Sequence, residues 1–257
     1  MEAVAKKTEY SFARFEKKYR LNTEEYQKFI ARIKENVHHD DYYESSICSI
    51  YFDTDDFRLI RESIEKPIYK EKFRIRSYGI PNENSDVFLE IKKKYKGTVY
   101  KRRIMMPLNK ARAYLTNYSI SENQEKIENK QIFREIDWFL HSYNLLPKAF
   151  IAYDRLAYVG NEDDNLRITF DKNIRYRTDM LDMKYGDFGL LIDNLNPTVM
   201  EIKFQNTIPL WLADDLCNMH LYPTPFSKYG QVYKTALLFN NAAIEANMMK
   251  RGGVHCA

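Results

Sequence analysis

The chain has 257 residues, of which 44% are hydrophobic and 30% charged, and this composition excludes a disordered, collagenous or low-complexity protein. Its net charge of +4 is too small to make the whole protein a polyanion binder. Three widely spaced cysteines form neither a disulfide framework nor a zinc pattern, and neither a membrane-spanning apolar run nor a secretory signal is visible. We therefore expect a cytoplasmic globular protein without a membrane segment.

The first half of the chain reads as two strand–helix pairs followed by three strands. In chain order we expect a strand over residues 14–21, a helix over 24–36, a strand over 46–53, a helix over 55–65, and strands over 69–78, 86–95 and 98–106. Short turn-like connections join the last three strands, so they should form an antiparallel meander.

The second half continues with helices and further strands. In chain order we expect helices over residues 109–117 and 122–143, strands over 148–159, 165–172, 174–177 and 198–205, and helices over 210–219 and 231–240. No linker rich in Pro, Gly or Ser and no internal repeat interrupts the chain. A single domain is therefore expected over residues 1–257, with a core from about 12 to 240 and short tails at both ends.

Positive charge is concentrated in one part of the sequence. Between Lys66 and Arg103 there are twelve basic and four acidic residues, a net charge of +8. The remainder of the chain must then be net acidic. A basic band on an otherwise acidic molecule indicates a local binding site for an anion.

Strand alternation places many basic residues on shared faces. Side chains of the same parity point to the same side of a strand. This rule groups Arg74 with Arg76, Glu90 with Lys92 and Lys94, Lys101 with Arg103, Tyr153 with Arg155, and Glu201 with Lys203, and it adds Arg167 from a further strand. The alternate positions are largely apolar.

Two architectures are compatible with such strands. In an open sheet, the charged face would lie in water. If instead the helices between the strands cover the apolar face, the basic face turns into the lumen of a closed barrel, where an anion must neutralise it. Because Arg and Lys dominate the polar face, we predict an α+β fold: a closed antiparallel β-barrel with helices packed on the outside and a polyphosphate-like ligand in its tunnel.

Two shorter motifs lie outside these strand faces. Ser227 and Lys228 precede a predicted helix, where a hydroxyl, an ammonium group and backbone N–H groups together suit a phosphate. His38 and His39 are adjacent, and adjacent histidines point apart, so a surface loop is expected there rather than a metal site.

Eight short motifs occur along the chain in one order. They are Ser49-Ile-Tyr-Phe-Asp53, Lys72-Phe-Arg-Ile-Arg-Ser-Tyr-Gly79, Phe88-Leu-Glu-Ile-Lys92, Tyr100-Lys-Arg-Arg103, Tyr153-Asp-Arg155, Leu166-Arg-Ile-Thr-Phe-Asp171, Met200-Glu-Ile-Lys203 and Phe226-Ser-Lys-Tyr229. This order resembles the VTC domains, the polyphosphate-polymerase domains of the vacuolar transporter chaperone complex and their bacterial relatives, within the triphosphate tunnel metalloenzyme (CYTH-like) superfamily. The resemblance covers about residues 12–239.

The resemblance implies roles for the matched positions, and the shared faces add a few neighbours. The residues expected to be catalytic are Arg74, Arg76, Arg155, Arg167 and Lys228. Those expected to bind phosphate are Lys18, Lys92, Lys94, Lys101, Arg103, Tyr153, Lys203 and Ser227. Glu201 is expected to hold a divalent metal, Mn²⁺ or Mg²⁺.

One departure from the superfamily pattern bears on the reaction. Many of its hydrolases begin with Glu-x-Glu-x-Lys, whereas here Arg14 stands at the first acidic position, before Glu16 and Lys18. Fewer carboxylates disfavour a two-metal site that activates water, so we expect transfer of the ATP γ-phosphate to a growing polyphosphate chain. The alternatives are a triphosphatase of the same superfamily and a non-catalytic polyphosphate-binding module. Nucleic acid is not an expected partner, because aromatic residues do not alternate with the basic ones as stacking platforms would.

Overall fold

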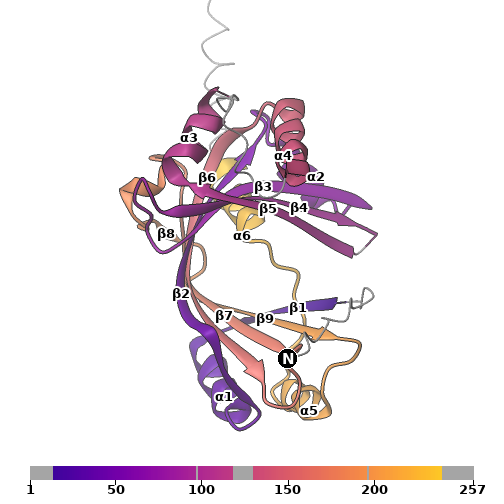
Figure 1. Cartoon of the computed structure of the whole chain (residues 1–257). Coiled ribbons are helices and arrows are strands. Elements are labelled where there is room, and N and C mark those ends of the chain that lie inside the picture. The colour runs from indigo at the N-terminus through magenta and orange to yellow at the C-terminus, as the bar shows by residue number, and fades with distance from the viewer. Residues whose placement is uncertain (1–13, 97, 118–129, 196, 239–257) are drawn as a thin grey trace, which may run out of the picture. The chain divides into compact units, whose positions relative to one another are not determined.

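The computed structural model describes residues 14–96, 98–117, 130–195 and 197–238 (Figure 1). Its strands are β1 (Arg14–Leu21), β2 (Val37–Asp53), β3 (Tyr69–Tyr78), β4 (Asp86–Tyr95), β5 (Thr98–Pro107), β6 (Leu146–Gly160), β7 (Arg167–Arg177), β8 (Leu190–Leu191) and β9 (Thr198–Gln205). Its helices are α1 (Thr23–Ile33), α2 (Arg58–Ile64), α3 (Leu108–Asn117), α4 (Lys130–Tyr143), α5 (Leu210–Asn218) and α6 (Lys228–Val232), with short helical turns η2 (Met183–Tyr185) and η3 (Tyr233–Leu237). The start of the helix expected over 122–143 and the terminal tails lie outside the described residues.

The strands hydrogen-bond into one sheet in the order β1-β9-β7-β6-β2-β3-β4-β5, with β8 paired to β7. The pairs β1–β9, β9–β7, β2–β3, β3–β4 and β4–β5 are antiparallel. An antiparallel sheet with helices was predicted and is confirmed. Within the described part of the chain this order starts at β1 and ends at β5, so closure of the sheet into a barrel stays a prediction.

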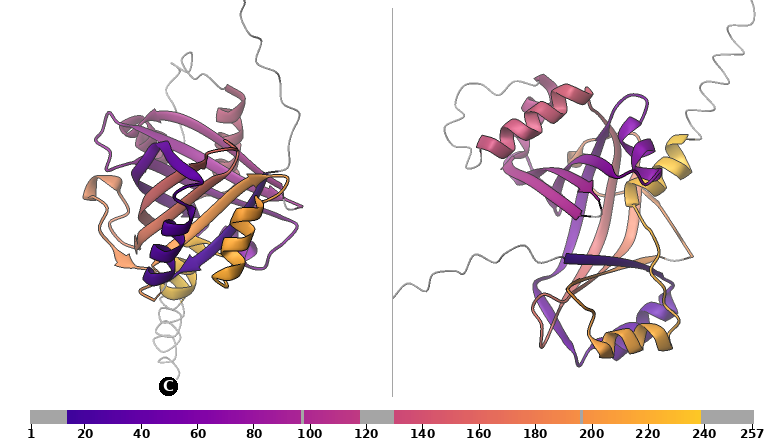
Figure 2. Two further views of the ribbon diagram at one scale, coloured as in Figure 1. Left: turned by 90° about the horizontal axis from the view of Figure 1, so that it is seen from below. Right: turned by 90° about the vertical axis from the view of Figure 1, so that its right-hand side faces the viewer.

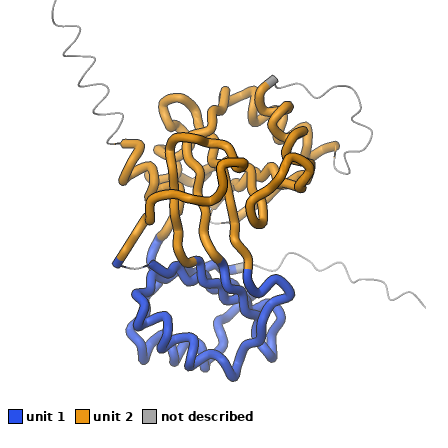
Figure 3. The backbone as a smooth tube through the Cα atoms, turned by 90° about the vertical axis from the view of Figure 1, so that its left-hand side faces the viewer, with its two compact units in different colours: residues 1–44, 155–171, 195–225 blue, residues 45–154, 172–194, 226–257 orange. Residues whose placement is uncertain are grey.

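The chain divides into two compact units, each assembled from three separate segments (Figure 3). Unit 1 comprises residues 1–44, 155–171 and 195–225, and unit 2 comprises residues 45–154, 172–194 and 226–257. Strands β2, β6 and β7 contribute residues to both units. That the whole chain is one domain stays a prediction.

Unit 1 has its core on one face of β1, β9 and β7. Alternation buries Leu21, Ile168 and Met200 on that face, and Phe29 and Ile33 of the amphipathic helix α1 pack in the same cluster. Helix α5 lies beside α1 against these strands (Figure 2). The opposite face of the three strands is therefore left for polar side chains.

Unit 2 repeats this arrangement on β2, β3, β4 and β5. Phe73, Ile75, Leu89 and Ile91 are fully or almost fully buried, and they pack against α3 and α4 on one side of the strands (Figure 1). The other side carries Arg74, Arg76 and most of the basic residues of β3–β5, whereas Lys93 and Arg102 lie on the side of α4. The alternation seen in the sequence thus holds in both units.

Two sequence expectations were wrong in detail. β2 begins at Val37, so His38 and His39 lie on a strand and not in a surface loop. The strands expected over 165–172 and 174–177 are the single strand β7, which continues through Asn173 although that residue adopts a positive φ of 48°.

Asp53 fixes where α2 begins and ties it to α6. Its buried carboxylate accepts hydrogen bonds from the backbone N–H groups of Thr54, Leu59 and Ile60 at 2.8–3.0 Å, and from the hydroxyl of Tyr229 at 3.1 Å. Burial raises the pKa of Asp53, and these hydrogen bonds partly offset that rise. The side chain of Asp53 therefore joins the end of β2 to the start of α2 and to Tyr229 of α6.

We expect Asp53→Ala to lower the free energy of unfolding by about 3 kcal/mol, because it leaves buried donors without an acceptor. Chemical denaturation measures this change. Asp55→Ala is the matched control, since the Asp55 side chain is 93% exposed, and it should leave the unfolding midpoint nearly unchanged. Equal effects of the two substitutions would contradict the anchoring role of Asp53.

Candidate functional site

Glu90 is a buried carboxylate in a group of cations on the polar face of unit 2. The register places it opposite Arg74 on β3 and Arg103 on β5. Nε and Nη2 of Arg74 each lie 2.8 Å from its Oε2, and Nε of Arg76 lies 3.6 Å from the same oxygen. Nζ of Lys101 lies 3.8 Å from Oε1. Three cations therefore share one carboxylate whose side chain is 2% exposed.

The charges in this group persist at neutral pH. Burial raises the pKa of Glu90, but Arg74, Arg76 and Lys101 outweigh burial and hold that pKa below its usual value. Burial lowers the pKa of Arg74, whereas Tyr51 and Glu90 raise it, with a net increase. The pKa of Lys101 is lowered, by burial first and then by Arg103 and its other cationic neighbours, while Glu90 opposes that fall. The group keeps an excess of positive charge that an anion can neutralise.

Tyr51 connects this group with α6. Its hydroxyl accepts a hydrogen bond of 2.9 Å from Nη1 of Arg74, and its ring stacks on Tyr229 with a centroid distance of 5.0 Å. Burial raises the pKa of Tyr51, but the charges of Arg74, Arg76 and Lys228 lower it more. Lys228 thus lies within electrostatic reach of the hydroxyl that Arg74 binds.

The start of α6 lies on the same polar face. Nζ of Lys72 donates to Oγ of Ser227 at 2.8 Å, and that oxygen also accepts from the backbone N–H of Gly230 at 3.1 Å. Nζ of Lys228 lies 4.2 Å from the ring centroid of Tyr153. α6 begins at Lys228, three residues before the predicted helix, because Ser227 caps it.

Nine of the residues predicted from sequence belong to unit 2. Four of them lie beside Tyr51, Glu90 or Lys72: Arg74, Arg76, Lys101 and Ser227. The charge of Lys228 also acts on Tyr51. Tyr153 joins through Lys228. Lys92, Lys94 and Arg103 lie on the same face by register, and the guanidinium of Arg103 stacks at 4.9 Å on Phe88.

In unit 1, charges of opposite sign alternate across the polar face of β1, β9 and β7. The register aligns Glu16 with Lys203 and Arg167 in one row, and Lys18 with Glu201 in the next. Nζ of Lys18 lies 3.1 Å from Glu16 and 3.6 Å from Glu201, and Nζ of Lys203 lies 2.7 Å from Glu201.

The two predicted arginines of unit 1 also have acidic partners. Arg155 binds both carboxylate oxygens of Asp171, at 2.6 and 2.8 Å. Nη2 of Arg167 lies 3.0 Å from Asp40, and its side chain is 44% exposed. All five residues predicted in unit 1 therefore take part in ion pairs. In unit 2, by contrast, several cations share the single carboxylate of Glu90.

Glu201 stays ionised in this setting. Burial raises the pKa of Glu201, but the charges of Lys203 and Lys18 lower it by more than burial raises it. Its pKa is therefore well below the usual range. Burial lowers the pKa of Lys18, while Glu201 and Glu16 raise it, with a net increase. Glu201 is therefore an ionised oxygen donor held between two ammonium groups.

Two neighbouring carboxylates of unit 1 are oxygen donors of the kind that a divalent cation prefers. Glu16 and Glu201 both contact Lys18, so their carboxylates are neighbours, and hard oxygen ligands suit Mg²⁺ or Mn²⁺. In the part of the chain that the structure describes, no three His, Cys, Asp or Glu side chains gather into a group that could hold a metal. One or two carboxylates with phosphate oxygens are a typical Mg²⁺ environment, and a cage of protein ligands is not required.

Several buried polar atoms have no hydrogen-bond partner among the described residues. In unit 2 they include Nε of Arg76, Oε1 of Glu90 and Oγ of Ser49, and the register places Ser49 opposite Arg76. In unit 1, Oγ1 of Thr169 is such an atom, opposite Glu201. A buried polar atom without a hydrogen bond costs about 1–3 kcal/mol. The N–H of Arg76 and the hydroxyls of Ser49 and Thr169 can donate hydrogen bonds to an anionic ligand, whereas the carboxylate oxygen of Glu90 cannot.

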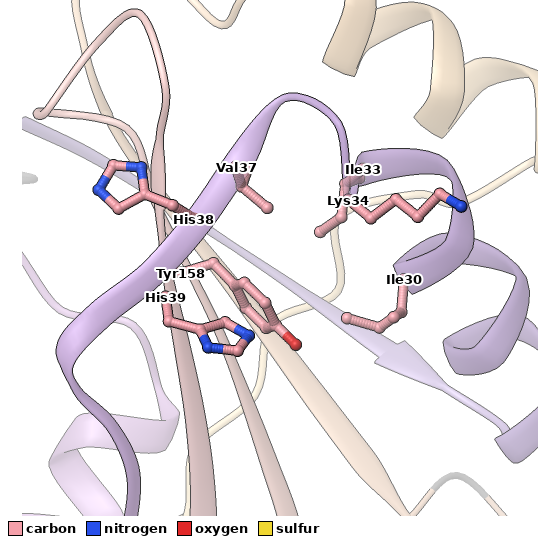
Figure 4. A pocket seen from close by; sticks show the side chains of 7 residues that line it. All are labelled: Ile30, Ile33, Lys34, Val37, His38, His39 and Tyr158. Carbon is pink, nitrogen blue, oxygen red and sulfur yellow. The ribbon is translucent and has the colours of Figure 1, made fainter.

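A shallow hollow in unit 1 is lined by other residues: Ile30, Ile33, Lys34, Val37, His38, His39 and Tyr158 (Figure 4). His38 and His39 point to opposite sides of β2, as adjacent strand residues do. His38 contacts Asn161 at 3.0 Å, and His39 stacks on Tyr43 with a centroid distance of 3.7 Å. The hollow is mainly apolar and aromatic, and it contains none of the residues predicted as a site.

Sequence reasoning did not name several residues of these clusters as site residues, among them Tyr51, Lys72, Glu90 and Asp171. Lys72 and Glu90 have the parity of the predicted site residues, and that signal was available. The contacts of Tyr51 with Arg74 and of Asp171 with Arg155 depend on strand register, which the alternation of one strand does not reveal.

No helix in the described ranges is long and apolar enough to cross a membrane.

Comparison with known proteins identifies the relatives of this chain. Residues 13–237 match the family model described as the VTC domain. The chain is 24% identical over 219 residues to vacuolar transporter chaperone complex subunit 4 of Trypanosoma brucei brucei, a match that covers 72% of this chain and 28% of the relative. It is 23% identical over 219 residues to the protein of the same name in Trypanosoma cruzi, with 72% and 27% covered. The match thus spans little more than a quarter of each curated relative.

Among solved structures, HpAC1 from Hippeastrum, for which a dominant triphosphatase activity is described, has a TM-score of 0.50 with this chain. The sequences are 17% identical, and the match covers 87% of this chain and 96% of that chain. At this identity the likeness shows a shared fold.

The sharing of Glu90 by several cations predicts the effect of Glu90→Gln on stability. This substitution removes the negative charge between the cations, so it should lower the free energy of unfolding by about 3 kcal/mol at pH 7. Because the folded-state pKa of Glu90 is lowered, its stabilising effect is present above the unfolded pKa and is lost as pH falls below about 4. The difference between wild type and variant should therefore shrink in acid, which denaturation at several pH values measures.

Tripolyphosphate supplies the second readout for the same variant. An anion that replaces the lost charge should raise the melting temperature of Glu90→Gln more than that of the wild type. A smaller rise in the variant would contradict the view that Glu90 and an anion compete for the same cations.

Proposed function

Because the chain belongs to the VTC domain family, we propose that it is a polyphosphate polymerase domain, which transfers the γ-phosphate of ATP to a growing polyphosphate chain. The observation that carries the proposal is the charge balance in unit 2. Arg74, Arg76 and Lys101 share Glu90, and Lys228 adds its charge at Tyr51. Such a group binds a multiply charged anion more readily than cations that each have an acid of their own.

The reaction requires that the polyphosphate end and ATP be held in line and that the negative charge on the transferred phosphate be stabilised. A terminal oxygen of the polyphosphate chain would attack the γ-phosphorus of ATP in line. A new P–O bond forms as the bond from the γ-phosphorus to the bridging oxygen of the β-phosphate breaks, and ADP leaves with that electron pair. The chain is then longer by one phosphate. No covalent protein nucleophile takes part in this scheme.

Arg74, Arg76 and Lys228 would hold the phosphates and stabilise the charge that spreads over their oxygens in the transition state. Arg155 and Arg167 are proposed for the same function in unit 1, where phosphate oxygens would share them with Asp171 and Asp40. The phosphate-binding roles of Lys18, Lys92, Lys94, Lys101, Arg103, Tyr153, Lys203 and Ser227 are part of the proposal.

Glu201, with Glu16 beside it, would hold Mn²⁺ or Mg²⁺. When bound, the cation would neutralise charge on the phosphate oxygens. Lys18 and Lys203 keep Glu201 ionised, so that the site is ready for a cation at neutral pH. The closed barrel with a basic tunnel and a cytoplasmic location complete the proposal.

One assay tests the function. The protein is incubated with ATP and Mn²⁺, ADP release is measured, and the products are separated on a gel stained for polyphosphate. We expect long chains to appear and one ADP to be released for each phosphate added. Inorganic phosphate without chains would instead show a triphosphatase, and binding of tripolyphosphate without turnover would show a binding module. Either result would overturn the proposed polymerase.

Two substitutions separate the metal site from the phosphate site. Glu201→Gln should lower turnover by at least about 100-fold, because it removes the charge that the cation needs, while tripolyphosphate still binds. Arg74→Ala should instead weaken tripolyphosphate binding itself. Turnover at increasing Mn²⁺ and calorimetric titration with tripolyphosphate measure the two effects.

Glu24→Gln is a matched control, since it removes an exposed carboxylate of α1 in the same unit. It should leave both properties unchanged. Near-normal Mn²⁺-dependent turnover of Glu201→Gln would show that Glu201 serves only to bind Lys18 and Lys203.

A further inference from the structure

The polar face of β3–β4–β5 differs on the two sides of Glu90. Toward one end of the strands, the next row contains Arg76, Phe88 and Met105, and the row after it Tyr78, Asp86 and Pro107. Toward the other end, the next row contains Lys72, Lys92 and Lys101, and the row after it Lys70, Lys94 and Val99. Beyond the row of Arg76, these strands therefore carry positive charge in only one direction from Arg74 and Glu90.

Lys70 and Lys94 lie directly opposite each other on neighbouring antiparallel strands. Like charges in such positions destabilise a sheet. Burial lowers the pKa of Lys70, and the charges of Lys94 and Lys66 lower it further. The ammonium of Lys70 donates to the backbone oxygen of Ser63 at 3.0 Å, which orients it without neutralising its charge.

The opposite face of the same strands shows the usual arrangement of charge. There Nζ of Lys93 lies 2.6 Å from Glu135 and 3.6 Å from Glu71, and Nε of Arg102 lies 3.4 Å from Glu135. The cations beside α4 thus have acidic partners. On the polar face, by contrast, Lys70 and Lys94 face each other, and an extended anion along this face would neutralise both.

Asp53 does not fill this role. It shares the parity of Tyr51 on β2, but its carboxylate is occupied by the backbone of α2 and by Tyr229. Both oxygens of Asp53 are therefore already hydrogen-bonded and do not compensate the lysines at the outer end of β3 and β4.

We infer that Lys70 and Lys94, reached from Arg74 through Lys72, form an outer subsite for the part of a linear polyphosphate that extends beyond the phosphates at Arg74 and Arg76. This inference rests on the proposed function. Lys70 lies four residues from Arg74 along β3, or about 13 Å at the rise of a strand. A triphosphate held at the arginines is too short to fill both places, so the outer subsite distinguishes long chains from short ones.

The subsite also sets a direction. A polyphosphate chain would run from Arg74 toward Lys70 and Lys94, because beyond Arg76 the rows on the other side carry no further positive charge. Contacts with a chain already made would slow its release between additions. The domain should therefore bind long chains more tightly than tripolyphosphate and make longer products than it would without the two lysines.

The test compares two double variants with the wild type. Lys70→Gln/Lys94→Gln removes the outer charges, and glutamine can still donate to the oxygen of Ser63. Lys110→Gln/Arg134→Gln removes two exposed charges from α3 and α4, on the other side of the sheet, and is the matched control. Calorimetry measures the affinity of each protein for tripolyphosphate and for a size-fractionated long polyphosphate, and gels measure the length of the products.

We expect the wild type and the control to bind the long chain at least about tenfold more tightly than tripolyphosphate. The outer variant should lose most of this preference and make shorter products, with its tripolyphosphate affinity unchanged. If the outer variant keeps the preference, or if both variants lose it equally, the outer subsite is wrong and the proposed polymerase still stands. If the wild type neither binds tripolyphosphate nor forms chains, the proposed function fails instead.

Discussion

A cation can be taken out of water only where negative charge compensates it, and this constraint decides what each polar face of the protein can do. In unit 1 the protein supplies the compensation itself, because Lys18, Lys203, Arg155 and Arg167 are all paired with acids. In unit 2, by contrast, Glu90 serves several cations at once. In the proposed function, an anionic ligand would complete the charge balance of unit 2.

Both faces exist because the strands largely alternate between apolar and charged residues. Helices α1 and α5 in unit 1, and α3 and α4 in unit 2, cover the apolar side and leave the charges on the other. Tyr51, Tyr229 and Asp53 then join this sheet to α6, so that Ser227 and Lys228 lie on the charged side. Packing of apolar residues thus determines the position of the phosphate-binding candidates.

The same alternation explains how far the sequence could predict the structure. β3 and β4 were predicted to the residue, because clear alternation is bounded by turn residues. The continuous β7 was missed because a positive φ at Asn173 carries no pattern of its own. The basic faces could be listed from parity, but Glu90 and Tyr51 gain their importance from register, and register depends on the connections between strands. Single-strand patterns therefore predict the faces, while the contacts across them need the structure.

The distribution of carboxylates bears on the choice between transfer and hydrolysis. A hydrolase that activates water with two metals needs several acids that other cations do not occupy. In unit 1, Glu16 and Glu201 share Lys18, while Arg155 binds both oxygens of Asp171. A single cation held by Glu201 and by the phosphates themselves would need fewer protein carboxylates than two metals do. It would serve a reaction whose nucleophile is already an anionic phosphate oxygen, because such a nucleophile does not need a metal to remove its proton.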